Sequence, residues 1–155
     1  MAWTNSKIFS ATIEDIFENT TALDADSDAW KAALFDNTIT PSQTVASAST
    51  AYAAGVWASG GVSDTPSWPA LGRPLTVSTS GFSSNVFTFD ANDTASADAT
   101  TDLTNVYGTL IYDHTLAAPV ADQGICYIYL GGANSVVNGS FTIVWAAGGL
   151  FTATA

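Results

Sequence analysis

Three short apolar runs near the end of the chain constrain its fold more than any other feature. The runs cover residues 106–112, 125–130 and 141–145, and each is bounded by Gly, Asn, Asp or Pro. Runs of about four to eight residues that are rich in β-branched and aromatic side chains, with turn residues between them, are typical of β-strands. The sequence therefore predicts a mainly β fold built from antiparallel strands.

The side chains of these runs alternate in two different ways. In residues 141–145, Phe141, Ile143 and Trp145 fall on one face and smaller or polar residues on the other, which predicts a strand with one face in the core. Residues 125–130 have no clearly polar face. We therefore expect this run to be the deepest strand of its sheet, covered on both sides.

The charge of the chain argues against two classes of partner. Its 155 residues carry a net charge of −11, with 14 acidic residues against Lys7, Lys31 and Arg73. Nucleic-acid binding needs clustered Lys and Arg, and so does docking on an anionic membrane. We therefore expect neither a nucleic acid nor a membrane as partner. Only 11% of the residues are charged and 47% are hydrophobic, which favours a homo-oligomer whose surface is partly covered by other subunits.

The N-terminus and the cysteine content predict where the protein is made. The first ten residues lack the basic start and the apolar core of a signal peptide, and no stretch approaches the ~20 apolar residues of a membrane span. Synthesis in a cytosol is therefore expected. Cys126 is the only cysteine, so an internal disulfide and a cysteine-cluster metal site are excluded, and its place in an apolar run predicts a buried thiol.

One helix is predicted, at the N-terminus. Apolar residues recur at near-helical spacing in residues 5–19, and Asn5 or Ser6 is available as the N-cap. Its acidic residues lie in the C-terminal half and oppose the helix dipole. We therefore expect this helix to depend on packing against the sheet or another subunit.

The composition of the middle of the chain sets the domain organisation. Residues 37–74 are dominated by Ala, Ser, Gly, Thr and Pro, which break up any long element. We predict a single antiparallel β-sandwich domain over residues 1–155, jelly-roll-like or immunoglobulin-like. Residues 1–19 form its helical arm and residues 37–74 a long irregular middle loop.

Three alternating aspartates raise the question of a metal site. Asp24, Asp26 and Asp28 match the acids that open a calcium loop. The positions that need Gly and a bidentate Glu hold Ala29 and Phe35 instead, which argues against an EF-hand. A solvated turn is favoured, so we predict no metal and no other cofactor; a looser calcium or magnesium site on these aspartates is the alternative.

No group of residues in the sequence predicts catalysis. His114 is the only histidine, so a zinc site has no second His or Cys, and a Ser–His–Asp arrangement has no identifiable Ser. The glycines of residues 131–139 lack the Lys and the strand-to-helix context of a phosphate loop. We therefore predict a binding or structural module rather than an enzyme.

Three segments together resemble a group of small virion proteins of tailed bacteriophages. They are residues 20–41, 105–132 and 135–151, about half of the chain. The motifs that carry the resemblance are WKAALF, which is expected to be a strand over residues 30–35, and then GTLIYD and GSFTIVW. The Ala- and Ser-rich middle of the chain departs from this group.

The resemblance implies a structural protein of the virion, of the capsid decoration or minor capsid type. The expected role is that of a decoration (cement) protein on the outside of the capsid shell, made in the host cytoplasm. Its implied partners are the major capsid protein and copies of itself. The alternatives are a tail or head-fibre component, and a carbohydrate- or calcium-binding module for host attachment.

Five apolar residues outside the predicted sheet are the candidates for capsid and subunit contacts. They are Trp3, Ile8 and Phe9 in the N-terminal arm and Trp57 and Trp68 in the middle loop. Aromatic side chains of this kind are frequent anchors of protein contacts. For Trp57 and Trp68 the sequence also allows packing back onto the core, which is the favoured interpretation. If the arm lies outside the sandwich, removing residues 1–17 abolishes capsid occupancy and leaves the sandwich folded.

Overall fold

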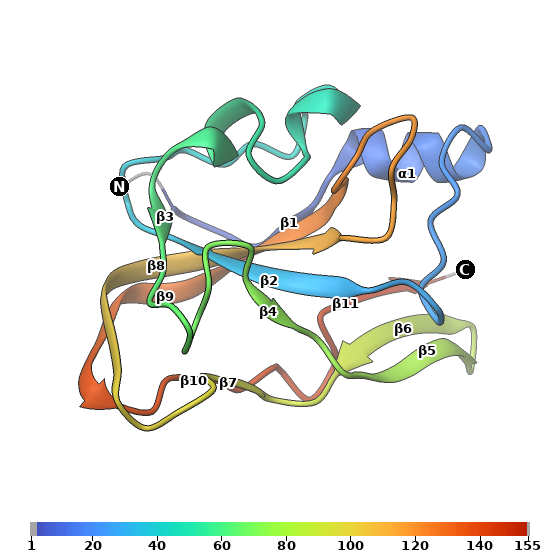
Figure 1. Cartoon of the computed structure of the whole chain (residues 1–155). Coiled ribbons are helices and arrows are strands. Elements are labelled where there is room, and N and C mark those ends of the chain that lie inside the picture. Colours follow the sequence, from blue (N-terminus) through green and yellow to red (C-terminus); the bar gives the residue numbers. More distant parts are fainter. Residues whose placement is uncertain (1–2, 155) are drawn as a thin grey trace.

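A computed structural model describes residues 3–154 and shows a mainly β protein (Figure 1); the first two residues of the predicted arm lie outside this range. One α-helix, α1, covers Ser10–Phe17, and two short 3-10 helices follow, η1 (Ser47–Ser49) and η2 (Gly55–Ala58). The strands, all paired antiparallel, are β1 (Lys7–Ile8), β2 (Trp30–Phe35), β3 (Gly61–Val62), β4 (Arg73–Pro74), β5 (Val77–Ser83), β6 (Val86–Ala91), β7 (Thr94–Ala95), β8 (Thr101–Asp113), β9 (Gly124–Gly139), β10 (Thr142–Ile143) and β11 (Phe151–Thr154). This is the sandwich-like antiparallel fold with an N-terminal helix that the sequence predicts.

The central strand of the main sheet is β8. The strand order is β1-β9-β8-β2-β3, and β4 also pairs with β2. β8 pairs with β9 on one side and with the whole of β2 on the other, and its residues 110–112 are fully buried. The prediction that residues 125–130 form the deepest strand is therefore wrong. Because β1 is only two residues long, most of one edge of β9 has no strand beside it, and residues 128–130 are half-buried.

Two apolar cores lie on opposite faces of the main sheet. In Figure 1, η1, η2 and α1 cover the upper face, and the small sheets β11-β6-β5 and β10-β7 lie below. Alternation along β2 sends Phe35 into the upper core and Leu34 into the lower core. The upper core consists of Trp3, Phe9, Ala33, Phe35, Ile39, Trp57, Leu110, Tyr112 and Tyr127. The lower core consists of Trp30, Ala32, Leu34, Trp68, Phe89, Ala91, Leu103, Val106, Ile111, Ile125, Cys126, Ile143 and Trp145.

The N-terminal segment differs from the predicted helical arm. β1 pairs with β9, and α1 begins only at Ser10. Ser6, a predicted cap, instead accepts a hydrogen bond at its Oγ from the Tyr129 backbone N–H, at 3.0 Å. The backbone of Lys7 and Ile8 pairs with the edge of β9. This tertiary pairing overrides the helix that the spacing of apolar residues predicts for this segment. The helix is tied to the β8–β9 hairpin by Thr12, whose hydroxyl donates to the Gly124 carbonyl oxygen at 2.6 Å.

The middle segment, residues 37–74, is irregular as predicted but closely packed. It contains η1, η2, β3 and β4, and no α-helix among the described residues. Trp57 lies in the upper core and Trp68 in the lower core. The segment therefore passes around the β2 edge of the main sheet and contributes to both faces, with β3 and β4 pairing to β2 on the way.

The last predicted strand keeps its faces but is short. β10 pairs with β7, outside the main sheet, over only two residues. Ile143 and Trp145 are buried, while Val144 is 73% exposed. The Trp145 indole N–H donates to the Thr94 hydroxyl at 3.0 Å. The predicted alternation is therefore confirmed, although side-chain burial rather than a long ladder of hydrogen bonds maintains it.

Candidate functional site

The structure buries most of the five residues that the sequence proposes as capsid contacts. The exposed fractions are 1% for Trp3, 0% for Phe9, 3% for Trp57 and 0% for Trp68, and Ile8 is half-buried. The prediction that these side chains form capsid contacts outside the sheet is therefore wrong for Trp3 and Phe9, while the core packing favoured for Trp57 and Trp68 is confirmed. The N-terminal arm and the middle segment pack on the main sheet, and their aromatic residues belong to the upper and lower cores.

A groove runs beside β9, where the main sheet faces the C-terminal segment. Three adjoining hollows form it, and the middle one has a volume of about 480 Å³. Neighbouring hollows share lining residues, so the surface is continuous. We call it the β9 groove, defined by Ser6, Ile8, Ile128, Leu130, Val144 and Leu150. Its lining is mostly apolar.

One wall of this groove is an unpaired strand edge. β1 pairs with β9 only at Cys126 and Tyr127. Further along, the Tyr129 N–H is bound by the Ser6 hydroxyl rather than by a strand. Within residues 3–154, no other strand pairs with this side of β9. An edge of this kind offers backbone donors and acceptors to an extended peptide.

Val144 and Lys7 set the chemistry of the β9 groove. Val144 is 73% exposed and lines two of the three hollows. Lys7 lines the hollow next to β1 and makes no ion pair in the part of the chain that the structure describes. Exposed aliphatic surface in a hollow is typical of a contact site. The groove therefore fits an apolar partner segment with an acidic group near one end.

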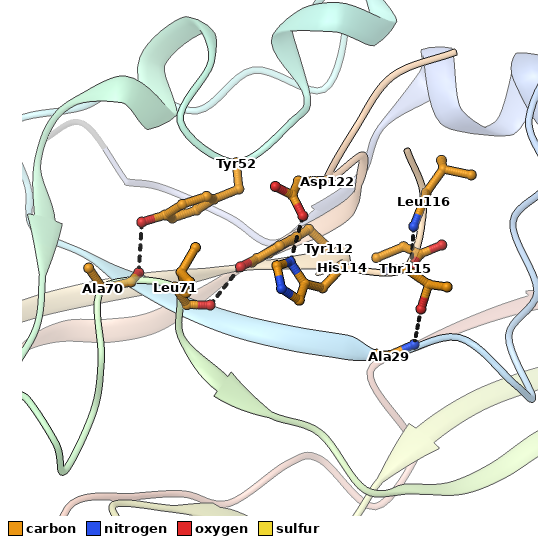
Figure 2. Close-up of polar contacts among 10 residues, drawn as sticks. Ala29, Tyr52, Ala70, Leu71, Tyr112, His114, Thr115, Leu116 and Asp122 are labelled. Carbon is orange, nitrogen blue, oxygen red and sulfur yellow. Dashed lines mark hydrogen bonds and ion pairs between the residues drawn. The ribbon is translucent and has the colours of Figure 1, made fainter. Parts of the chain in front are cut away.

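The predicted acidic turn meets the end of β8. The Asp24 backbone N–H donates to Asp28 Oδ2 at 2.6 Å, which closes the turn. Directly after it, the Ala29 N–H donates to the Thr115 hydroxyl at 2.6 Å, as Figure 2 shows. These bonds fix the turn against the loop that follows β8, and the Asp28 carboxyl lies beside Asp113.

Asp113 is a buried carboxylate with only one satisfied oxygen. Its Oδ1 accepts the backbone N–H groups of Thr115 at 2.7 Å and Leu116 at 3.2 Å, while Oδ2 has no hydrogen-bond partner. Burial, and then the Asp28 carboxyl beside it, raises the pKa of Asp113 from 3.8 to about 6, against the effect of the two N–H donors. At neutral pH the folded protein therefore holds an ionised carboxylate at a cost in stability.

Replacing Asp113 with asparagine is expected to raise the free energy of unfolding by about 2 kcal/mol at neutral pH in metal-free buffer. The amide keeps an acceptor for the Thr115 and Leu116 donors, offers an N–H to Asp28 and carries no charge. Because the pKa of Asp113 in the folded state lies above that of the unfolded chain, the wild-type protein gains stability as the pH falls from about 6 to 3.8. The advantage of D113N should therefore vanish near pH ~4. Urea unfolding across this range measures it, and an equal gain at both ends would contradict the pKa argument.

His114 pairs with an acid rather than with a nucleophile. Its Nδ1 lies 2.7 Å from Asp122 Oδ1 (Figure 2), and its ring stands edge-on to Tyr112 with centroids 6.1 Å apart. In the described range, no Ser, Thr or Cys side chain hydrogen-bonds to this ring. The view that the protein is not an enzyme stays a prediction from the sequence.

The aspartates proposed as metal ligands do not converge by themselves. The Asp26 N–H donates to Asp24 Oδ1 at 3.0 Å, so these acids are engaged within their own turn. Residues 3–154 contain no cluster of three or more His, Cys, Asp or Glu that could hold a metal ion. Over the same residues, no helix has the length and apolarity needed to cross a membrane.

Sequence reasoning missed both Asp113 and the β9 groove. Asp113 had a signal, because it follows directly on the apolar run 106–112 and so ends a strand that was expected to be buried. No sequence signal could have revealed the β9 groove, since its lining residues come from separate segments that only the tertiary fold brings together. Cys126, by contrast, is buried as predicted, and burial raises the pKa of its thiol to about 12.

Comparison with known proteins identifies no relative. No protein-family model, no curated protein and no solved structure matches the chain.

Proposed function

We propose that this protein is a non-enzymatic structural component of a tailed-bacteriophage virion, a decoration protein on the outside of the capsid shell. The observation that carries the proposal is the β9 groove, an apolar hollow along an open strand edge. The segments that resemble phage virion proteins supply most of its lining. Residues 105–132 contain Ile128 and Leu130, and residues 135–151 contain Val144 and Leu150.

The occupant of the β9 groove is an extended apolar segment of the major capsid protein. An open strand edge favours an extended partner segment, because the partner can add as a further strand and form main-chain hydrogen bonds with the edge. Ile128, Leu130 and Leu150 offer apolar contacts to alternate side chains of such a strand. Lys7 at the β1 end favours an acidic residue in the partner.

Binding of this kind stabilises a shell without a chemical step. A decoration protein that binds the assembled shell and not its separated subunits adds its binding free energy to the stability of the shell. Copies around a symmetry axis of the lattice bridge neighbouring subunits, so local opening must also break their contacts. The net charge of −11 keeps the protein from binding packaged DNA.

Quantitative mass spectrometry of intact virions and of tail-free heads tests the proposal. We expect many copies per particle, in proportion to the major capsid protein and retained on the heads. A few copies that leave with the tails would make the protein a tail or head-fibre component instead. Absence from both particles would overturn the virion role altogether.

The Val144→Glu variant tests whether the β9 groove is the contact. Val144 is 73% exposed, so the substitution is tolerated in the free protein, whereas a buried carboxylate in the contact should lower head occupancy by at least about tenfold. Val137→Glu is the matched control, because Val137 lies on β9 outside the groove and is 76% exposed. Equal occupancy of the two variants would rule the groove out as the capsid contact.

A further inference from the structure

The end of β8 holds two neighbouring carboxylates with no cation to balance them. Asp113 is fully buried, and its Oδ2 has no hydrogen-bond partner. The Asp28 carboxyl lies within hydrogen-bonding reach of it. Among the described residues the one ion pair joins His114 to Asp122, so neither Lys nor Arg compensates these two acids. A buried carboxylate oxygen left without a partner destabilises the fold unless something binds it.

Hydrogen bonds from backbone N–H groups hold the Asp28 and Asp113 carboxylates next to each other. The Ala29 N–H donates to the Thr115 hydroxyl at 2.6 Å, and the His114 N–H donates to the Ala29 carbonyl oxygen at 2.9 Å. Figure 2 shows how the first of these bonds holds the two turns together. Asp28 Oδ2 is held by the Asp24 N–H at 2.6 Å, and Asp113 Oδ1 by two N–H groups. In this arrangement the Asp113 Oδ2 atom is buried and has no hydrogen-bond partner.

We propose that Asp28 and Asp113 together bind a calcium ion. Ca²⁺ accepts about six to eight oxygen ligands in flexible geometry, including mono- or bidentate carboxylates, and water can complete its shell. Mg²⁺ requires a near-ideal octahedron at shorter distances, to which two carboxylates already held by backbone N–H groups adjust less readily. Zn²⁺ prefers His and Cys ligands, and the His114 ring is turned to Asp122.

This site differs from the calcium loop that the sequence suggests. It shares only Asp28 with the alternating series Asp24, Asp26 and Asp28, and it takes its second ligand from a strand distant in the sequence. A bound ion would clamp the acidic turn to the loop between β8 and β9. The proposal does not depend on the capsid role, because it concerns the isolated chain.

Thermal unfolding of the purified full chain, first treated with EDTA and then titrated with CaCl2, tests the proposal. Calcium at ~100 times its Kd should raise the Tm by about 5–10 °C. The same concentration of MgCl2 should give a smaller rise. No change in Tm at millimolar calcium would overturn the site, and a larger rise with magnesium would overturn the choice of ion.

Three variants locate the ligands. D113N and D28N should each abolish the calcium-induced rise in Tm, while both remain folded in EDTA because each amide keeps an acceptor for the existing N–H donors. Asp26→Asn is the matched control and should keep the full rise. Loss of the calcium response in the Asp26→Asn variant with retention in D113N would assign the ion to the sequential acidic turn and overturn the proposal.

Discussion

Replacing Trp3 with alanine is expected to lower the free energy of unfolding by about 3–5 kcal/mol. Trp3 is 1% exposed, and its indole N–H donates to the Asp36 carbonyl oxygen at 2.7 Å. Its ring centroid lies 5.9 Å from that of Trp57 and 6.0 Å from that of Tyr127. The alanine variant loses this burial and leaves a cavity in the upper core. Urea unfolding monitored by circular dichroism measures the loss.

The control for this prediction is Phe17→Ala, another truncation of an aromatic residue near the N-terminus. Phe17 is 86% exposed on α1, so its removal should change the free energy of unfolding by no more than about 0.5 kcal/mol. If W3A lost no more stability than this control, the N-terminal segment would not be seated in the upper core in solution.

Gly108 provides a sharper test of the same packing. A Cβ atom at this position would overlap the Trp3 ring at Cζ3, so G108A should be strongly destabilising in the wild-type protein. In the W3A background the ring is gone, and the added methyl group partly fills the space. The double-mutant cycle should therefore give a coupling energy of at least about 1 kcal/mol. Additive effects would show that the ring and Gly108 are not in contact.

The buried position of Trp3 also changes how the capsid contact must be tested. Removing residues 1–17 takes Trp3 and Phe9 out of the upper core and β1 off the edge of β9. The truncated chain should therefore be severely destabilised, contrary to the expectation from the sequence that the sandwich would stay folded. A loss of occupancy would then report unfolding, which is why a substitution at an exposed groove residue is the informative experiment.

The elements that sequence reasoning predicted well are those whose signal is local. The strand expected over residues 30–35 has the same bounds as β2, because all of its residues except Lys31 are apolar and both of its faces are buried. The alternation of Ile143, Val144 and Trp145 also holds, since it depends only on the period of two along an extended chain. The prediction that residues 125–130 form the deepest strand was wrong, because the depth of a strand depends on which segments pair with each of its edges.

The positions of the aromatic residues in the middle segment could not be predicted in this way. Residues 37–74 have no periodicity that assigns a face, so the sequence favours packing of Trp57 and Trp68 onto the core but leaves an exposed contact open. Their placement follows from the path of the segment around β2. The pair Asp28 and Asp113 has the same origin, since pairing of β2 with β8 brings the two turns together. Tertiary contacts of this kind leave no mark in either segment alone.

Replacing Trp68 with alanine is the second substitution expected to cost about 3–5 kcal/mol of stability. Trp68 is fully buried in the lower core, and its ring stands edge-on to Phe141 with centroids 5.5 Å apart. Its indole N–H donates to the Ala32 carbonyl oxygen of β2 at 3.2 Å. The side chain therefore fastens the middle segment to the underside of the main sheet.

Two further variants separate the contributions of Trp68. Trp68→Phe keeps most of the buried ring and removes the hydrogen bond to Ala32, so it should cost about 1–2 kcal/mol. Leu71→Ala is the control in the same segment; Leu71 is 44% exposed, and its carbonyl oxygen, which the substitution leaves in place, accepts the Tyr112 hydroxyl at 2.6 Å (Figure 2). If W68A cost less than about 1 kcal/mol in urea unfolding, the middle segment would not be anchored under the sheet, and Trp68 would again be available to a partner.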